Sequence, residues 1–302
     1  MSNTERQDVY ARITSKIIAS LEQRVRPWMK PWSAEHAAGR ITRPLRHNGK
    51  PYSGINILML WASAVEQGFT APIWMTFKQA LELNAHVRKG EKGSLVVYAN
   101  SITKTRHDDT SGEDVEREIP FLKGYTVFNV EQIDGLPEIY HAKMEPKLSP
   151  VERIAHAESF FAATKAVIRY GGNRAYYTMD PDCIQMPPIE AFRDAESFYS
   201  TLAHETTHWT RHQSRLERNF GRQTWGDEGY ASEELVAELG SAFLCADLEL
   251  TPEVRDDHAS YIASWLEVLK NDKRCIVQAA SYAQKAVDFL HSLQLEAKAE
   301  AT

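Results

Sequence analysis

Hydrophobic and polar positions divide the chain into a mixed first half and a mainly helical second half. In the first half, apolar residues recur at helical spacing in three segments and form β-type runs in two others. The predicted helices cover residues 4–25, 55–66 and 76–84, and the predicted strands cover residues 94–99 and 120–130. The polar, acidic residues 103–118 predict a poorly ordered hairpin tip between the strands. This pattern favours helices around a small antiparallel sheet.

The second half begins after a segment without periodicity. Residues 138–150 contain Pro146 and Pro150, which predicts a linker at 141–150 between domains at 1–140 and 151–302. Amphipathic helices are predicted from Val151, near Asp194 or Ser197, near Ser232 and from Thr251 to the C-terminal region. Residues 168–178 contain a diglycine and predict a hairpin, with a short strand after it. The predicted fold class is α+β, with a small α+β domain followed by a mainly helical one.

Charge is distributed unevenly along the 302 residues. The net charge is −6, yet residues 1–104 hold 15 Lys and Arg against 7 Asp and Glu, whereas residues 105–302 hold 20 against 34. A basic third on an acidic protein favours an anionic partner for that third, with nucleic acid as the leading candidate. The alternative is a basic surface that has no partner.

Several classes of protein are disfavoured by what the sequence lacks. The three cysteines, Cys183, Cys245 and Cys275, form no Cys-x-x-Cys pair, so free thiols in a reducing compartment are expected. The first residues do not resemble a signal peptide, and no apolar run is long enough to span a membrane. We therefore expect a cytoplasmic monomer without a membrane partner.

Basic and aromatic residues gather in three stretches of the first half. A rigid surface with aromatic rings beside cations is typical of proteins that bind single strands, where bases stack on the rings. Core packing is the alternative for the two tryptophans of the first stretch, Trp28 and Trp32. The glycine-rich loop 87–93 is a candidate binding site for the backbone phosphates of DNA. The candidate DNA-binding residues are Lys30, Trp32, Arg43, Arg46, Lys50, Tyr52, Lys89 and Lys92.

Residues 204–208 form a His-Glu-x-x-His motif. On a helix, His204 and His208 lie one turn apart on the same face, so both imidazoles can reach a single zinc ion. Glu205 then lies beside the metal, where it can accept a proton from water as a general base. His212 lies about 6 Å further along the helix axis and is not expected to be a ligand.

The helix predicted near Ser232 offers further carboxylates. Ser232 suits the N-cap position, and the helix dipole favours glutamates in a first turn, so a structural role for Glu233 and Glu234 is one alternative. The Glu-x-x-x-Glu pair that follows His-Glu-x-x-His resembles thermolysin-like zincins. That resemblance implies that Glu234 is the third metal ligand and that Glu238 orients His204. Glu233 or Glu238 could be the third ligand instead of Glu234. The metal could be zinc or manganese.

Short phrases along nearly the whole chain resemble the ArdC-type antirestriction proteins of conjugative plasmids. These phrases are Lys30-Pro31-Trp32 and residues 48–56, 89–93, 127–132, 204–208, 234–238 and 261–266. The resemblance implies an N-terminal domain that binds single-stranded DNA, akin to that of plasmid primases, and a zincin-like metallopeptidase domain. It also implies a role in shielding incoming plasmid DNA from host restriction.

Three functions are consistent with these motifs. The first is a DNA-binding antirestriction protein whose second domain acts on a host restriction protein or helps to cover DNA. The second is a DNA-tethered metalloprotease that cleaves DNA-associated proteins. The third is protection by DNA binding alone, with a catalytically silent metal site. The presence of Glu205 argues against the third, because a structural metal site needs no general base.

Overall fold

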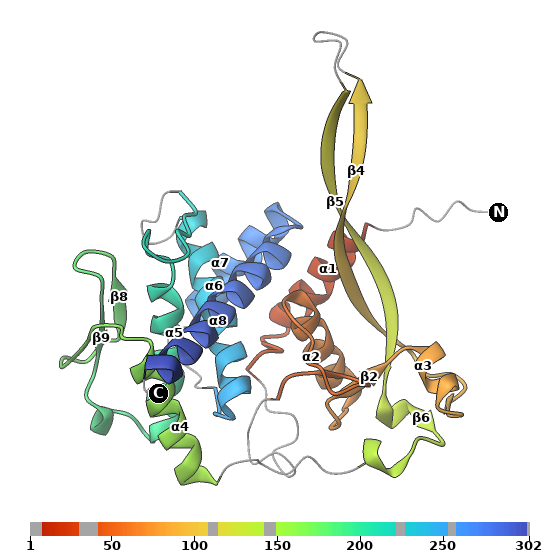
Figure 1. Ribbon diagram of the computed structural model, residues 1–302, viewed down its shortest axis with the longest axis horizontal. Helices are drawn as coiled ribbons and strands as arrows, with labels where there is room; N and C mark the ends of the chain where they lie inside the picture. The colour runs from red at the N-terminus through yellow and green to blue at the C-terminus, as the bar shows by residue number, and fades with distance from the viewer. Residues whose placement is uncertain are drawn as a thin grey trace.

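The chain forms two adjoining parts that follow one another in sequence (Figure 1). The computed structural model describes residues 8–29, 42–107, 114–141, 149–221, 227–252 and 258–300. The first part combines helices with a sheet and a long hairpin, and the second part is mainly helical. The predicted α+β class is confirmed. The domain limits at 140 and 151 stay a prediction, because most of the expected linker lies outside the described ranges.

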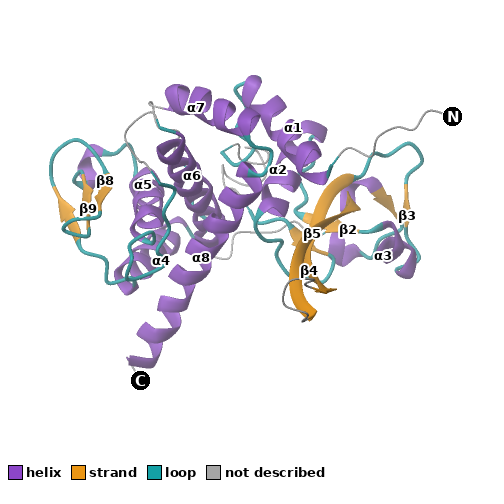
Figure 2. Cartoon of the chain, turned by 90° about the horizontal axis from the view of Figure 1, so that it is seen from above, coloured by secondary structure: helices purple, strands orange, loops and turns teal. Residues whose placement is uncertain are grey.

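A four-stranded sheet with the order β1-β2-β5-β4 organises the first part. Strand β1 runs parallel to β2, whereas β2 with β5 and β5 with β4 are antiparallel. A separate antiparallel pair joins β3 to β6. The strands are β1 (Leu45–Arg46), β2 (Ile73–Met75), β3 (His86–Val87), β4 (Ser94–His107), β5 (Asp114–Asn129) and β6 (Ile133–Asp134). Figure 2 shows β2, β4, β5 and α3 at one end of the molecule, beyond α1 and α2.

The β4–β5 hairpin is longer than the sequence predicts. Its backbone register is continuous from Ser94 opposite Val127 to His107 opposite Asp114, and the two strands project from the body (Figure 1). The expected disordered tip at 103–118 is therefore mostly strand, and residues 108–113 lie outside the described ranges. Polarity did not exclude strands here, because the ladder joins backbone groups rather than side chains.

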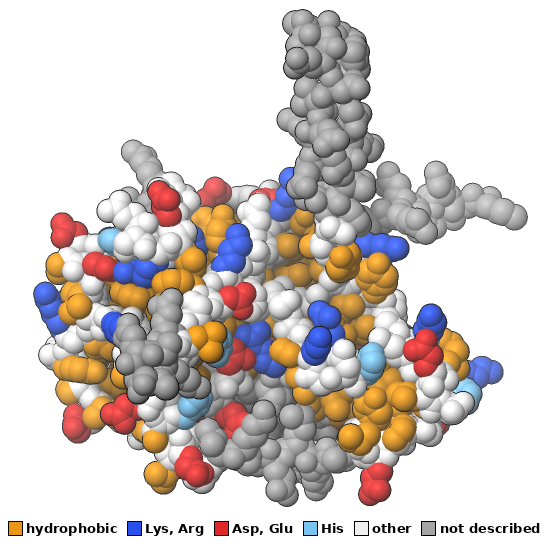
Figure 3. Space-filling model, viewed as in Figure 1, with side chains coloured by type: hydrophobic (Ala, Val, Ile, Leu, Met, Phe, Trp, Pro, Cys, Tyr) orange, Lys and Arg blue, Asp and Glu red, His pale blue; other side chains and the backbone are white. Residues whose placement is uncertain are grey.

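The helices of the first part agree with the predicted ones. They are α1 (Val9–Glu22), α2 (Ile55–Gln67) and α3 (Phe77–Glu82). Gly68 ends α2 at φ +76°, a left-handed conformation that glycine adopts without a steric cost. Thr76 begins α3 with a reciprocal capping box to Gln79. Hydrophobic side chains remain exposed over β5 and around α3, with basic and histidine side chains among them (Figure 3).

The second part places a three-stranded sheet against helices. The helices are α4 (Pro150–Ala163), α5 (Ala195–Trp209), α6 (Glu228–Leu248), α7 (His258–Asn271) and α8 (Cys275–Glu300), and the strands are β7 (Ile168–Tyr170), β8 (Tyr176–Thr178) and β9 (Cys183–Met186). None of the helices in the described part of the chain combines the length and apolar character needed to cross a bilayer.

Two local predictions in the second part are wrong. The hairpin expected at 168–178 does not form, because β9 lies between β7 and β8, parallel to the first and antiparallel to the second. Ser232 does not begin a helix, because α6 already starts at Glu228 with Asp227 at its N-cap. Glu233 and Glu234 therefore lie in the second turn of α6, beyond the first turn where the helix dipole alone would favour a carboxylate. Their burial needs another explanation.

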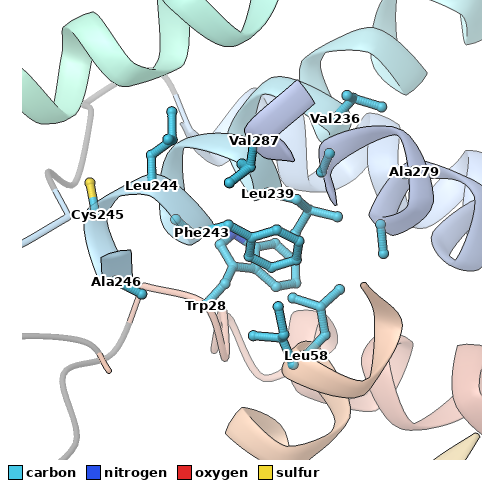
Figure 4. Close-up of a cluster of buried hydrophobic side chains, with 14 of the residues drawn as sticks. Trp28, Leu58, Val236, Leu239, Phe243, Leu244, Cys245, Ala246, Ala279 and Val287 are labelled. Carbon is cyan, nitrogen blue, oxygen red and sulfur yellow. The ribbon is translucent and has the colours of Figure 1, made fainter. Parts of the chain in front are cut away.

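One hydrophobic core runs through both parts. Trp28 is fully buried and meets Trp265 of α7 edge to face at a centroid distance of 6.2 Å. Leu58 of α2 belongs to the same cluster as Phe243 of α6 and Val287 of α8, and Figure 4 shows these side chains pointing toward one another. The core alternative for Trp28 is confirmed. The first part therefore contributes to the packing that supports α6.

Candidate metal centre

The candidate metal centre lies between α5 and α6. Asp194 caps α5 by accepting a hydrogen bond from the Ser197 backbone N–H at 2.7 Å, as expected for an N-cap aspartate. The two helices approach closely at Gly240, where a Cβ atom would lie 2.5 Å from Thr207 Cγ2. A larger residue at position 240 would require the Thr207 side chain or the helices to shift. The close approach brings the histidine face of α5 against the glutamates of α6.

Three side chains converge on one point between these helices. Glu234 Oε2 lies 3.5 Å from His204 Nε2, and Glu234 Oε1 lies 3.4 Å from His208 Nε2. One ligand atom from each residue falls within 4.8 Å of the others. Two ligands held about 2.0–2.1 Å from zinc at the tetrahedral angle are about 3.4 Å apart. The spacing of the three donors therefore fits a single divalent ion.

A buried ion pair holds the other side of His208. Glu233 Oε1 lies 3.0 Å from His208 Nδ1, and Arg218 donates to both Glu233 oxygens at 2.7 and 2.8 Å. Arg218 also donates to the Thr210 hydroxyl and the Thr207 carbonyl oxygen, each at 3.0 Å. Because an ionised carboxylate only accepts hydrogen bonds, Nδ1 of His208 carries the proton and Nε2 is left for a metal.

Glu238 lies behind His204. Its Oε2 is 3.9 Å from His204 Nδ1, while its Oε1 accepts hydrogen bonds from Arg26 Nη1 at 3.0 Å and Trp28 Nε1 at 3.3 Å. All four side chains are nearly buried. Arg26 and Trp28 precede the sheet of the first part by sequence. The N-terminal segment therefore completes the shell of polar groups around the metal centre.

Glu205 follows His204 on α5 and is 3% exposed. A carboxylate in this position of the motif lies beside the metal rather than among its ligands. Tyr230 lies one turn before Glu234, and its hydroxyl lies 3.0 Å from that of Tyr261. Among the described residues, Tyr230 is therefore the phenol nearest in sequence to a candidate metal ligand.

The buried charges shift one another's pKa values. Burial would lower the pKa of His208, but Glu234 and Glu233 outweigh it and raise this pKa to about 10. A divalent ion would therefore have to displace the proton from Nε2 of His208, because a histidine ligand is neutral. Burial would raise the pKa of Glu233, but Arg218 and His208 lower it to about 2. The pKa of Glu234 is also held well below its ordinary value, because the histidines outweigh its burial. Both carboxylates are therefore ionised at neutral pH, the form in which a carboxylate binds metal.

The candidate DNA-binding residues fall into different environments. Lys50, Lys89 and Lys92 are exposed, and the guanidinium of Arg46 lies over the Tyr52 ring, 5.3 Å from its centroid. Lys30 and Trp32 lie outside the described residues.

Arg43 faces the interior. Its guanidinium makes two 2.7 Å hydrogen bonds to the Asp247 carboxylate, and its side chain is only 10% exposed. It also donates to Gln284 at 3.1 Å and lies over the Phe243 ring. Arg43 therefore joins the two parts of the molecule, and we leave it out of the surface considered for DNA.

Sequence reasoning did not identify Arg218, Arg26 or Trp28 as parts of the metal centre. Arg218 lies in the loop after α5, and the other two lie some 200 residues before Glu238 in the chain. No helical spacing links them to the ligands. A buried arginine indicates a buried acidic partner, because a buried charge needs an opposite charge nearby. A single sequence does not show which arginines are buried.

The two parts of the chain match two protein families. Residues 7–128 match the N-terminal domain of anti-restriction factor ArdC, and residues 155–282 match a zincin-like metallopeptidase family. The uncharacterized protein y4eC of Sinorhizobium fredii (strain NBRC 101917 / NGR234) is 43% identical over 295 residues, which cover 96% of this chain and 94% of that protein. A DNA primase TraC of Escherichia coli is 38% identical over 296 residues, which cover 93% of this chain but 27% of the primase.

Two solved structures extend the match to three dimensions. The metal-free crystal structure of antirestriction protein ArdC from plasmid R388 superposes with a TM-score of 0.79 at 49% identity, covering 96% of this chain and 98% of that one. Its Mn(II)-bound form superposes with a TM-score of 0.75, covering 95% and 98%. With such identity over nearly the whole of both chains, the chain belongs to the ArdC family of antirestriction proteins.

Proposed function

We propose that this protein protects incoming plasmid DNA from host restriction by binding single-stranded DNA through its N-terminal region. We further propose that its second part is a metal-dependent peptidase that acts on a protein near that DNA, with a host restriction protein or another DNA-associated protein as substrate. Such a protein would act in the recipient cytoplasm. The observation that carries the enzymatic part is the convergence of His204, His208 and Glu234 beside Glu205.

The donor set supports a catalytic rather than a structural ion. Two imidazoles and one carboxylate are three protein ligands, which leaves a position for water or substrate. Either zinc or manganese is compatible with nitrogen and oxygen donors, and the related R388 protein has been solved with Mn(II). We propose zinc first and manganese as the alternative.

The residues of this chain have separable tasks in the proposed reaction. A divalent ion in this site would polarise a peptide carbonyl and make water more acidic. Glu205 would take the proton of the attacking water and later deliver it to the leaving amine. Glu233, held by Arg218, keeps the proton of His208 on Nδ1 and fixes the orientation of that ring.

The DNA-binding part of the proposal is supported by charge and by family. Residues 1–104 carry more than twice as many Lys and Arg as Asp and Glu. Exposed lysines of this region, among them Lys50, Lys89 and Lys92, can neutralise phosphates. The family match over residues 7–128 covers this same basic region. Binding should weaken steeply as salt is raised.

Substitution of Glu205 tests the enzymatic part. In the full chain, Glu205→Gln should leave bound metal and affinity for single-stranded DNA unchanged, while hydrolysis of a protein substrate falls by about 10²–10⁴-fold. The same variant should be compared with the wild type in plasmid transfer into a restricting recipient. Transfer at the wild-type level would favour protection by DNA binding alone and count against a peptidase mechanism.

A further inference from the structure

A cleft of about 390 Å³ opens at the base of the β4–β5 hairpin. It lies between these strands, the turn after β1 and the start of α2, and we call it the β4 cleft. Residues that line it include Arg46, His47, Tyr52, Tyr98, Tyr125 and Val127. Its volume falls within the roughly 300–1,000 Å³ of small-ligand sites. The cleft is far from the metal centre in sequence and belongs to the other part of the molecule.

Two tyrosines offer exposed ring surface at this cleft. Tyr98 of β4 is 53% exposed and Tyr125 of β5 is 41% exposed, whereas Val96 and Val127, two residues away along the same strands, are buried. Val96 pairs with Tyr125 in the ladder, and Tyr98 pairs with Lys123. Residues directly opposite one another in antiparallel strands lie on the same face. The sheet therefore holds both rings and a lysine on one face.

The charge around these rings is positive. Lys123 Nζ lies 5.2 Å from the centroid of the Tyr125 ring, and the Arg46 guanidinium lies over the Tyr52 ring. Among the described residues that line the cleft, none is Asp or Glu. Figure 3 shows hydrophobic side chains over the lower part of β5 and around α3, with basic, histidine and some acidic side chains among them. Aromatic faces beside cations complement a base and its phosphates.

An extended peptide is a poorer occupant of this cleft. Strand β4 is an edge of the sheet, where a peptide could add as a further strand. Asn56 of α2 prevents this at Val97, because its side-chain amide donates to the Val97 carbonyl oxygen at 2.8 Å and accepts from the Val97 N–H at 2.7 Å. The backbone groups that a new strand would need at this point are occupied. What the cleft still offers is ring surface and positive charge.

We propose that the β4 cleft binds an unpaired base of single-stranded DNA by stacking on Tyr98 and Tyr125, with Arg46 and Lys123 holding the adjacent phosphates. This inference rests on the proposed function, which it deepens by assigning a base-binding site. A single strand is the expected ligand because its base faces can unstack and reach the rings, whereas a duplex keeps them covered. Stacking on a ring face tolerates any base, because every base has a π-face, so the site should show little sequence preference.

The test compares full-length variants by fluorescence anisotropy with a labelled oligothymidine of 20 nucleotides. Tyr98→Ala with Tyr125→Ala should raise the Kd for the single strand by about fivefold to 150-fold, because stacking of one base on an aromatic ring accounts for that range. Tyr98→Phe with Tyr125→Phe keeps the rings and should bind within about threefold of the wild type. Tyr170→Ala with Tyr176→Ala is the matched control, because those tyrosines are 61% and 50% exposed in the second part.

The outcomes separate this proposal from the proposed function. Wild-type affinity in the Tyr98 and Tyr125 double alanine variant, with the wild type binding well, overturns the β4 cleft alone. An equal loss in the Tyr170 and Tyr176 control, or an equal loss for a duplex of the same sequence, also overturns it. If the wild type itself does not bind single-stranded DNA at low salt, the proposed function fails. Thermal melts that agree among the variants exclude unfolding as the cause of a loss.

Discussion

The metal centre and the β4 cleft are built in opposite ways. At the metal centre, His204, His208 and Glu234 are each less than 10% exposed. A carboxylate oxygen lies 3.0 Å from the outer nitrogen of His208, and another lies 3.9 Å from that of His204. At the cleft, Tyr98 and Tyr125 are about half exposed and have few fixed partners. The first site depends on donors fixed to within tenths of an ångström, as a metal requires. The second needs only ring surface and charge, as stacking does.

Because of this difference, the two sites should respond differently to substitution. A buried charge that loses its partner remains buried, so the cost falls on the whole fold. When an exposed tyrosine or lysine is replaced, water takes its place, so the free energy of unfolding should hardly change. Only the affinity for a ligand of that surface should fall. Substitutions around the metal centre should therefore reduce stability and metal affinity together. Substitutions at the proposed DNA-binding surface should change affinity for DNA and leave the stability of the fold unchanged.

Arg218→Met should give the largest loss of stability. It leaves the Glu233 carboxylate, 2% exposed, without the guanidinium that holds both its oxygens. Breaking a buried pair on one side costs about 3–5 kcal/mol, and urea unfolding of the full chain measures it. Arg174→Met is the matched control, because Arg174 is exposed and its replacement should change stability by less than about 0.5 kcal/mol. Similar midpoints for both variants would contradict the buried network.

Gly240→Ala should come next. The new Cβ would lie 2.5 Å from Thr207 Cγ2 and 2.8 Å from Thr207 Oγ1, and overpacking of this kind costs about 1–3 kcal/mol. Because the clash separates α5 from α6, bound metal should fall as well, as measured by atomic absorption. Thr207→Ala removes both clashing atoms and should recover part of the loss in the double variant. A double variant whose losses simply add would show that the two helices do not conflict at this point.

The parts of the fold that the sequence predicts well are those fixed by helical period. His204 and His208 meet because they are one turn apart on α5, and Glu234 joins them from the next helix. The choice among Glu233, Glu234 and Glu238 could not be made from spacing, since it depends on how α6 is rotated against α5. The structure turns Glu234 to the inner nitrogens of both histidines and the other two glutamates to the outer ones.

The exposure of cations could not be predicted from the sequence. Arg43 and Arg46 are three residues apart and equally basic, yet one is paired with Asp247 and the other lies over Tyr52 at the surface. The partner of Arg43 lies about 200 residues away, in α6. Long-range packing of this kind is set by the shared core of the two parts rather than by local pattern. The domain boundary predicted near residue 140 gives no sign of this shared core.

Arg26→Met tests whether the two parts are linked at the metal centre. Removal of its 3.0 Å hydrogen bond to Glu238 should loosen the carboxylate behind His204. Loss of a group that orients a metal-binding histidine typically lowers metal affinity by about 10–100-fold. Because Arg26 contacts His204 only through Glu238, its loss should lower metal affinity by about tenfold or less. Competition with a chelator measures the affinity. Arg24→Met, outside this contact, is the control, and equal metal affinity in both variants would contradict the link.

Lys50→Ala should have the smallest effect and separates surface charge from stacking. Lys50 is exposed in the turn after β1, which borders the β4 cleft. Its loss should remove at most one phosphate contact and lower the salt dependence of single-strand binding, as the slope of log K against log salt, by about 0.7. The urea midpoint should not change. The Tyr98 and Tyr125 alanine variant should weaken binding at every salt concentration with the slope unchanged, because stacking releases no counterions. If both variants change the salt dependence of single-strand binding equally, the β4 cleft binds DNA through charge and not through stacking. The metal centre and the cleft would then differ only in how deeply their residues are buried.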